Sequence, residues 1–166
     1  MSVTYRLEEL LDYSDHERAK WQAWITASPK RLNIVCQPGG RFSTIGSLID
    51  HIFLVERRHL ARVEGGTPPE ATGVAAGDFG ALFEYGALVR ADFRRCIEDL
   101  NDERANETVA FTVGSTPGTF QMTRRKLCLT ILLHETRHFA QAALAARLAG
   151  DPSPGEHDLF YFTEFA

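Results

Sequence analysis

The stretch Cys128-Leu-Thr-Ile-Leu-Leu-His134-Glu-Thr-Arg-His138-Phe-Ala-Gln141 decides how this chain folds. Its flanks have the apolar spacing of a long helix, and in a helix residues i and i+4 lie one above the other on the same face. His134 and His138 have this spacing, so their imidazoles can converge on one metal ion. The stretch therefore predicts a helix that carries a metal site.

The two histidines fall on the predicted inward face of this helix. That face consists of Leu127, Ile131, His134, His138, Gln141, Ala145 and Leu148, in steps of three and four residues. An unpaired buried polar group costs about 1–3 kcal/mol, so polar side chains on a core face need partners. A metal ion is one such partner. We expect Gln141 to hydrogen-bond the second ring nitrogen of a ligand or a metal-bound water, or to pack at the end of the bundle.

Length and composition indicate one globular domain over residues 1–166, with 44% hydrophobic and 24% charged residues. The net charge is -4 and no run is dense in Lys or Arg, so no nucleic-acid partner is expected. The N-terminus has no hydrophobic signal segment and no stretch is long and apolar enough for a membrane span, which predicts a cytoplasmic protein. Cys36, Cys96 and Cys128 are odd in number and far apart, and we expect them to be reduced, buried thiols.

Four long helices and one short hairpin are predicted. The helices run from about Thr4 to Ser28, from a cap at Ser43 or Thr44 to Gly65, from a cap at Asp78 through Leu100, and from a cap at Thr123 to Gly150. Between Glu107 and Met122 the apolar period changes to two, as in strands, around the turn Ser115-Thr-Pro-Gly118. This order of elements predicts an all-α four-helix bundle with a hairpin before the last helix.

Two further features predict how the elements pack. Gly86 interrupts the third predicted helix at a cost of about 1 kcal/mol relative to Ala, which indicates close helix packing there. The tail Gly155-Glu-His157-Asp-Leu-Phe-Tyr-Phe is rich in aromatic residues. We expect these residues to pack against the bundle or against another subunit.

A catalytic site of this kind takes three protein ligands and leaves one position for water or substrate, so a third ligand is needed. The remaining histidines are His16, His51, His59 and His157. His51 lies beside the apolar stripe of the second helix and could face the fourth helix. His59 is about 12 Å further along the same axis, so His51 and His59 cannot bind one ion, and we expect His59 to be a core or surface residue.

The motifs Phe42-Ser-Thr-Ile-Gly-Ser-Leu-Ile-Asp-His51-Ile-Phe and Leu133-His134-Glu-Thr-Arg-His138-Phe-Ala-Gln141 resemble those of the DinB-like family of metal-binding four-helix bundles. The resemblance spans nearly the whole chain, including the tail from Pro154 to Phe160. It implies that His51, His134 and His138 hold a divalent metal, and it suggests a homodimer. His16 stands where relatives more often have an aromatic or amide side chain, so its relation to the metal is left open.

The resemblance also implies a thiol-dependent transferase or isomerase that uses a low-molecular-weight thiol in stress response and detoxification. Three neutral imidazoles leave the charge of a divalent ion uncompensated, which favours an anionic fourth ligand such as hydroxide, carboxylate or thiolate. We therefore expect a metal-dependent thiol-cofactor transferase with a small-molecule substrate, and zinc, nickel, iron or copper as the metal. No catalytic residue is identified. The alternative is a non-catalytic metal-binding or stress-response bundle, which a closed site with four protein ligands would favour.

The segment His134-Glu135-x-x-His138 is also the HExxH pattern of zinc metalloproteases, and it supplies a weaker hypothesis of a metal-dependent hydrolase. Such a protease needs Glu135 as the base that activates water, and a third ligand downstream. Gly and His are absent from the metzincin positions after His138. In a bundle, we expect Glu135 to face solvent or to pair with Arg137 or Arg94.

Overall fold

The computed structural model describes residues 6–114 and 116–162. Four long helices form its body: α1 (Leu7–Ala27), α2 (Ile45–Glu64), α3 (Phe79–Glu98) and α5 (Arg124–Leu148). Shorter elements are η1 (Pro29–Asn33), α4 (Asp102–Asn106), β1 (Thr108–Val113), β2 (Thr116–Thr123) and η2 (Leu159–Tyr161). The predicted all-α class is confirmed, whereas η1, α4 and η2 were not predicted. The expected start of the first helix at Thr4 lies outside the described residues.

Three of the four long helices, α2, α3 and α5, begin at the predicted capping residues. The side-chain oxygens of Thr44, Asp78 and Thr123 accept hydrogen bonds from the backbone N–H three residues ahead, at 3.2, 3.0 and 3.3 Å. Each such cap contributes about 1 kcal/mol, because it satisfies a backbone donor that the helix leaves free. α2 ends at Gly65, whose φ of 80° is the left-handed conformation that glycine adopts readily.

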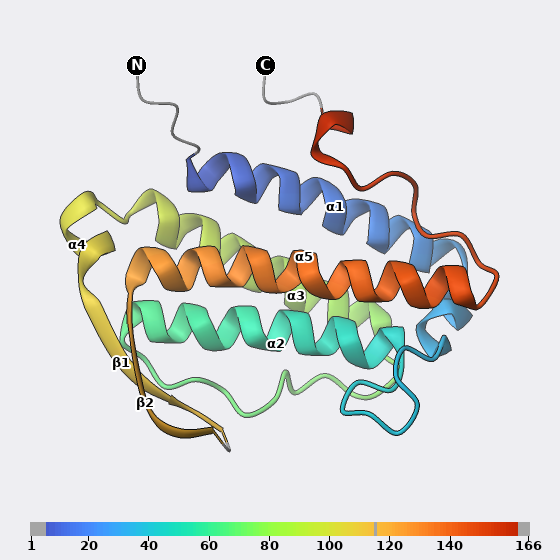
Figure 1. The fold of residues 1–166 in the computed structure, drawn as a ribbon, viewed down its shortest axis with the longest axis horizontal. Helices are drawn as coiled ribbons and strands as arrows, with labels where there is room; N and C mark the ends of the chain where they lie inside the picture. Colours follow the sequence, from blue (N-terminus) through green and yellow to red (C-terminus); the bar gives the residue numbers. More distant parts are fainter. Residues whose placement is uncertain (1–5, 115, 163–166) are drawn as a thin grey trace.

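α2 and α5 lie side by side, with α1 and α3 packed around them (Figure 1). One apolar cluster surrounds Trp21, Phe53 and Phe139, and a second surrounds Leu11, Phe93 and Leu127. Burial of these large side chains supplies most of the driving force for packing the helices. In the described part of the chain, no helix has both the length and the apolar composition needed to cross a membrane.

Gly86 of α3 marks the close helix contact predicted from the sequence. A Cβ atom at this position would lie 2.6 Å from the Phe53 ring of α2, well inside van der Waals contact. The carbonyl of Gly86 also accepts a hydrogen bond of 3.1 Å from the Arg18 guanidinium of α1. The missing side chain therefore lets three helices meet at one level of the bundle.

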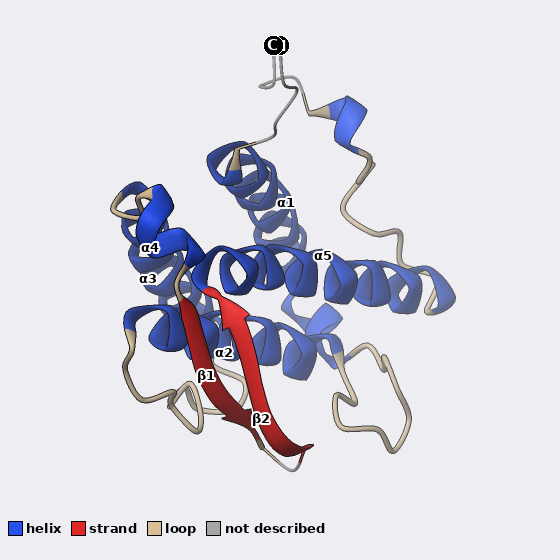
Figure 2. Cartoon of the chain, turned by 60° about the vertical axis from the view of Figure 1, so that its left-hand side comes forward, coloured by secondary structure: helices blue, strands red, loops and turns tan. Residues whose placement is uncertain are grey.

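The predicted hairpin is present and projects from the helices (Figure 2). β1 and β2 are antiparallel, with Phe111 opposite Phe120 and their rings stacked 5.9 Å apart. Val109 and Phe111 are partly buried against the second apolar cluster, which anchors the base of the hairpin. Ser115 of the predicted turn lies outside the described residues.

The C-terminal tail returns over α1 (Figure 1). Phe162 is buried, and its ring lies 5.8 Å from Tyr13 and 5.2 Å from His16. At Phe162 the tail therefore packs on its own bundle, which is one of the two outcomes expected for its aromatic residues.

Candidate metal centre

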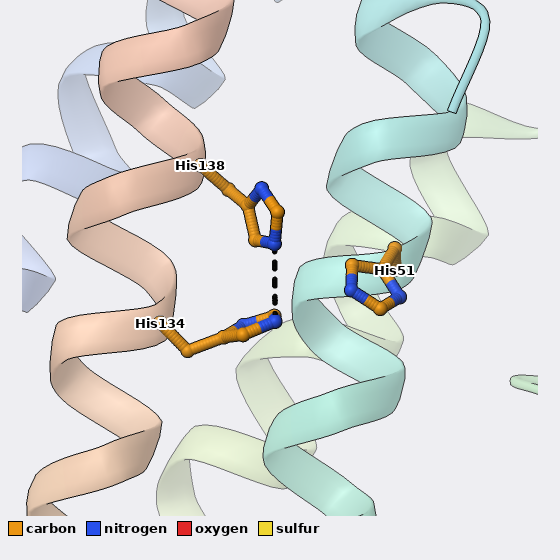
Figure 3. A group of neighbouring side chains, drawn as sticks. All are labelled: His51, His134 and His138. Atoms are coloured by element: carbon orange, nitrogen blue, oxygen red, sulfur yellow. Dashed lines mark hydrogen bonds between the residues drawn. The ribbon is translucent and has the colours of Figure 1, made fainter. Parts of the chain in front are cut away.

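The structure brings His51, His134 and His138 together between α2 and α5 (Figure 3). One nitrogen from each ring belongs to a set whose members all lie within 4.8 Å of one another. The Nε2 atoms of His134 and His138 are 3.0 Å apart. All three side chains are half-buried, so the cluster lies at the border between the core and solvent.

Helix geometry and helix packing together produce this convergence. His134 and His138 are one turn apart on α5, and their ring centroids are separated by 4.3 Å. α2 runs beside α5 and places the His51 ring 5.0 Å from His134 and 5.1 Å from His138. Residues more than eighty positions apart in the sequence thus share one small volume.

The spacing of the His134 and His138 nitrogens fits a divalent transition metal. Two nitrogens that are each about 2.1 Å from one ion stand roughly 3.0–3.4 Å apart when the angle between them is about 90–109°. The 3.0 Å between the Nε2 atoms of His134 and His138 lies at the edge of this range. Imidazole ligands suit zinc, nickel, iron and copper, so the donor set defines a class of metal rather than one element.

Burial and nearby charge keep the three imidazoles neutral. Burial, followed by the neighbouring His138 and the charges of Arg41 and Arg58, lowers the pKa of His51 to about 4. Burial and the other histidines lower the pKa of His134 to about 3, and burial lowers the pKa of His138. A neutral ring offers a free lone pair to a metal, so at neutral pH the ligands need not first lose a proton.

Gln141 lies one turn beyond His138 and hydrogen-bonds its ring, which was one of the contacts expected for this residue. The Oε1 atom of Gln141 is 2.6 Å from Nδ1 of His138. Because an amide oxygen only accepts, Nδ1 donates the hydrogen and Nε2 of His138 retains the lone pair. Gln141 therefore favours the tautomer in which the nitrogen facing His134 can bind a metal.

Phe42 connects the histidine cluster to a cavity. Its ring stacks on His51 at 4.0 Å and meets the edge of His138 at 5.9 Å. The cavity has a volume of about 240 Å³ and is mostly apolar; it is lined by Val35, Cys36, Gln37, Phe42, Leu48, Gln141, Leu144, Ala145 and Leu148. Burial raises the pKa of the Cys36 thiol, so this cysteine is not an activated nucleophile.

The remaining histidines lie elsewhere. His16 contacts Phe162, and His157 stacks on Trp21 with ring centroids 5.9 Å apart. His59 is partly buried next to Phe111, and burial and Arg62 lower its pKa to about 4. Across residues 6–114 and 116–162, the only group of three or more His, Cys, Asp or Glu side chains with this spacing is the three-histidine cluster, so no fourth protein ligand closes it.

The expectation for Glu135 is wrong. Glu135 is only 2% exposed and pairs with Arg18 and Arg90, not with solvent, Arg137 or Arg94. The predicted inward residues Leu127, Ile131 and Ala145 are buried, but the buried face of α5 extends past them to include Glu135, while the histidines lie at its edge. The other buried residues of this face are Cys128, Leu132, Phe139, Ala142, Ala143 and Ala146. For the same reason Leu148, expected to point inward, is 81% exposed.

Glu135 belongs to an ionic network to which each long helix contributes one buried charged side chain, and partly exposed Asp15 of α1 also pairs with Arg90 at 3.2 Å. Arg18 of α1 donates to Glu135 of α5 at 2.9 Å and to Glu56 of α2 at 2.5 Å, and Arg90 of α3 contacts both carboxylates. Burial alone would raise the pKa of the Glu135 carboxyl, but the charges of Arg18 and Arg90 outweigh burial and hold it well below its usual range. Sequence reasoning missed this network.

The network decides between two interpretations of the HExxH pattern. A metalloprotease base must be free to take a proton from a water bound at the metal. Glu135 instead has both carboxylate oxygens engaged by Arg18, Arg90 and the Ser14 hydroxyl in the bundle interior. The pattern in this chain therefore consists of two histidines one helical turn apart, next to a structural carboxylate. A hydrolase at this site would lack the catalytic base that the pattern normally supplies.

Comparison with known proteins gives a family for the chain. No curated protein matches it. The family model of the DinB superfamily matches residues 32–142, which is well over half of the chain and includes all three clustered histidines. The chain therefore belongs to the DinB superfamily.

Proposed function

We propose that the protein is a divalent-metal enzyme that transfers a low-molecular-weight thiol to a small electrophilic substrate. The observation that carries the proposal is the cluster of three neutral imidazoles, within 4.8 Å of one another, that contains no carboxylate. His51, His134 and His138 would be the metal ligands. When bound, the divalent ion would supply a Lewis acid whose uncompensated charge favours a thiolate and deprotonates a thiol near neutral pH.

The protein's own residues supply the surroundings of this chemistry. Gln141 orients the His138 ring by accepting the hydrogen of its Nδ1 atom, and the Phe42 ring covers one side of His51. The charges of Arg41, Arg58 and Arg137 act on the histidines and add positive potential. Positive potential favours an anionic sulfur over a neutral thiol. The 240 Å³ cavity beside Phe42 and Gln141 would take the apolar part of a substrate.

The proposed reaction is a substitution at carbon. The thiol gives up its proton, its sulfur forms a bond to the electrophilic carbon, and the leaving group departs with the electron pair of the broken bond. The released proton balances the charge of the leaving group. No oxidant or reductant is needed, so the thiol and the electrophile are the only two reactants.

An open cluster favours an enzyme over a metal-sequestering bundle. A structural or storage site is normally closed by four protein ligands, whereas three ligands leave a position for substrate. In the described residues His16 is directed to Phe162 rather than to the cluster, so it does not complete a closed site.

Two tests address this proposal. In protein loaded with cobalt(II), addition of cysteine or glutathione should produce a saturable thiolate-to-cobalt absorption band, which ethanol and serine should not produce. Conjugation of the same thiols to 1-chloro-2,4-dinitrobenzene should then be faster with metal-loaded protein than with His51→Ala protein. A cobalt site whose spectrum does not respond to any thiol would contradict the proposal.

The same proposal includes a homodimer in the cytoplasm. The outer face of α5 exposes Leu129, Leu133, Leu144 and Leu148, which is unusual for a helix that faces only water. Light scattering on a size-exclusion column should give twice the mass of one chain, and a single-chain mass at all concentrations would contradict this part of the proposal.

A further inference from the structure

The cavity beside the three-histidine cluster is lined by uncharged side chains. As the described residues form it, its nine lining residues carry aliphatic, aromatic, amide or thiol groups and include no Asp, Glu, Lys, Arg or His. Arg41 lies over the Phe42 ring, with its Cζ atom 5.3 Å from the ring centroid, and is not part of the lining. A charged group inside this cavity would therefore lose water without gaining an ion-pair partner, which costs far more than burial of a neutral group.

The cavity is open to solvent on one side and closed by the core on the other. Val35, Leu144 and Leu148 are exposed and form its rim. Leu48 and Ala145 are buried and form its floor. A small molecule can therefore reach the floor from solvent without displacing any core residue.

Two lining residues connect the cavity to the histidines. The Phe42 ring stacks on His51, and the Oε1 atom of Gln141 accepts the hydrogen of Nδ1 of His138. With its oxygen on His138, Gln141 keeps two amide N–H groups, for which the described part of the chain supplies no acceptor. A molecule in the cavity therefore lies next to the proposed metal ligands and beside a free neutral donor.

The volume of the cavity sets the size of what can enter. The volume is about 240 Å³, and an apolar cavity of about 150 Å³ suffices for benzene. One ring with one or two small substituents therefore fits. Phe42, Leu48 and Leu144 offer apolar surface to the faces of such a ring.

We propose that this cavity holds the electrophile of the thiol transfer, and that the electrophiles the enzyme accepts are neutral molecules whose reacting part is one substituted ring. The role as electrophile site rests on the proposed function, whereas the choice of a neutral ligand rests on the lining of the cavity. Gln141 would donate to a neutral acceptor on the ring, such as a carbonyl oxygen.

Fluorine NMR with three probes of nearly the same shape tests the choice of charge. 4-Fluorobenzamide is neutral, 4-fluorobenzoate is an anion and 4-fluorobenzamidine is a cation at neutral pH. The full-length protein is used without metal, so that carboxylate binding to an ion does not enter the comparison. We expect saturable binding of the amide, at least tenfold tighter than that of either ion. No saturable binding of the amide, or an ion that binds as tightly, would overturn the proposal.

Substitutions on α5 locate the bound ring. Ala145→Leu fills the floor and should abolish binding of 4-fluorobenzamide. Leu144→Lys places a cation at the exposed rim and should improve binding of 4-fluorobenzoate relative to the amide at least fivefold. Leu129→Lys is the matched control, because Leu129 is also exposed but does not line the cavity. Circular dichroism checks folding, and the Lys pair decides if Ala145→Leu misfolds. Wild-type binding in folded Ala145→Leu, or equal preferences in the two Lys variants, would refute the site.

A second copy of the chain is the rival occupant, because Leu144 and Leu148 also belong to the exposed leucine face of α5. The affinity for 4-fluorobenzamide should be the same at low and high protein concentration, with light scattering on the same samples. An affinity that falls as dimer forms would assign the rim to the second copy and overturn the proposal.

The probe experiment fails separately from the proposed function, because it needs neither metal nor thiol. Selective binding of 4-fluorobenzamide together with a cobalt spectrum that ignores thiols would remove the transfer reaction, and with it the role of the cavity as electrophile site. A thiol-responsive cobalt spectrum without selective binding of the amide would overturn the inference about the electrophile alone.

Discussion

Gln141 determines which nitrogen of His138 is available to a metal. The 2.6 Å contact of its Oε1 atom with Nδ1 places the hydrogen on Nδ1 and leaves the lone pair on Nε2. Nε2 is also the atom 3.0 Å from His134. A single amide outside the cluster therefore prepares one ligand in the tautomer that the site needs.

Replacing Gln141 should weaken metal binding without removing the site. In Gln141→Ala the His138 ring loses its partner and can turn or change tautomer, so we expect metal affinity to fall about 10–100-fold. Competition titration against a chromophoric chelator measures the change. Gln22→Ala on the exposed face of α1 is the matched control. An affinity in Gln141→Ala equal to that of the control would show that the amide has no such role.

The lowered histidine pKa values predict how the stability of the metal-free protein depends on pH. The pKa of His134 is about 3 in the folded protein, against about 6.5 in an unfolded chain. Between these values the unfolded state binds more protons, so the free energy of unfolding falls as pH decreases through 6.5 toward 3. Above pH 6.5 the ring is neutral in both states and the effect vanishes.

Urea unfolding of metal-free wild type and His134→Gln between pH 7.5 and about 5 tests this prediction. Gln does not titrate, so wild type should lose stability relative to the variant as pH falls below about 6.5. Other groups titrate in both proteins and cancel in the comparison. A difference in unfolding free energy that is constant over this range would be inconsistent with the lowered pKa.

At the scale of the helices, one buried ionic network connects α1, α2, α3 and α5. Arg18, Glu56, Arg90 and Glu135 are each less than 10% exposed and contact one another across the bundle interior. A buried pair is costly to desolvate, and breaking it by removing one partner leaves an uncompensated charge. The network therefore makes the relative placement of the four helices sensitive to a single residue.

Glu135→Gln should destabilise the protein by about 3–5 kcal/mol, because Arg18 and Arg90 lose a charged partner. Its metal content should stay that of the wild type, because the histidines lie on a different face of α5. Asp92→Ala removes a partly exposed partner of Arg95 and Arg57 and should cost only about 0–1 kcal/mol. Chemical unfolding and elemental analysis give the two readouts. Unchanged stability with lost metal would contradict both assignments.

Two glycines of α3 should respond to alanine in opposite directions. Gly86→Ala would drive a Cβ atom to 2.6 Å from the Phe53 ring, and overpacking of this kind costs about 1–3 kcal/mol. At Gly80 the nearest atom to a new Cβ is 3.7 Å away, so alanine should stabilise by about 0.4–1 kcal/mol. Thermal unfolding of the two variants measures both changes. Stabilisation by Gly86→Ala would show that α2 and α3 do not touch as described.

For the whole molecule, the sequence predicts elements better than it predicts their contacts. Caps such as Thr44 and Asp78, followed by helical apolar spacing, are local signals, and the structure begins helices at both. The hairpin was likewise predicted from a local signal, the change of the apolar spacing to a period of two residues. Resemblance to a family supplied His51 as the partner of the pair on α5, and the structure places these rings together.

The network around Glu135 was missed because its partners come from three other helices. Glu135 and His134 are both polar and only about 100° apart on α5, so helical period alone does not decide which faces the core. A signal was nevertheless present. Arg18 lies in the buried series Leu11, Ser14, Arg18, Trp21 and Ile25, and Glu56 and Arg90 interrupt apolar series in the same way. When each of four helices carries one charged residue within its buried apolar series, these charges are expected to meet in the core.

The most direct test of the account is the metal content of the purified protein and of single histidine variants, prepared without chelator or affinity-tag nickel. Elemental analysis should find about one divalent transition metal per chain in the wild type and in the His59→Ala control. His51→Ala, His134→Ala and His138→Ala should each lose it while remaining folded. Metal retained with unchanged affinity in His51→Ala or His138→Ala, or no uptake by the wild type even after reconstitution, would contradict the three-histidine centre.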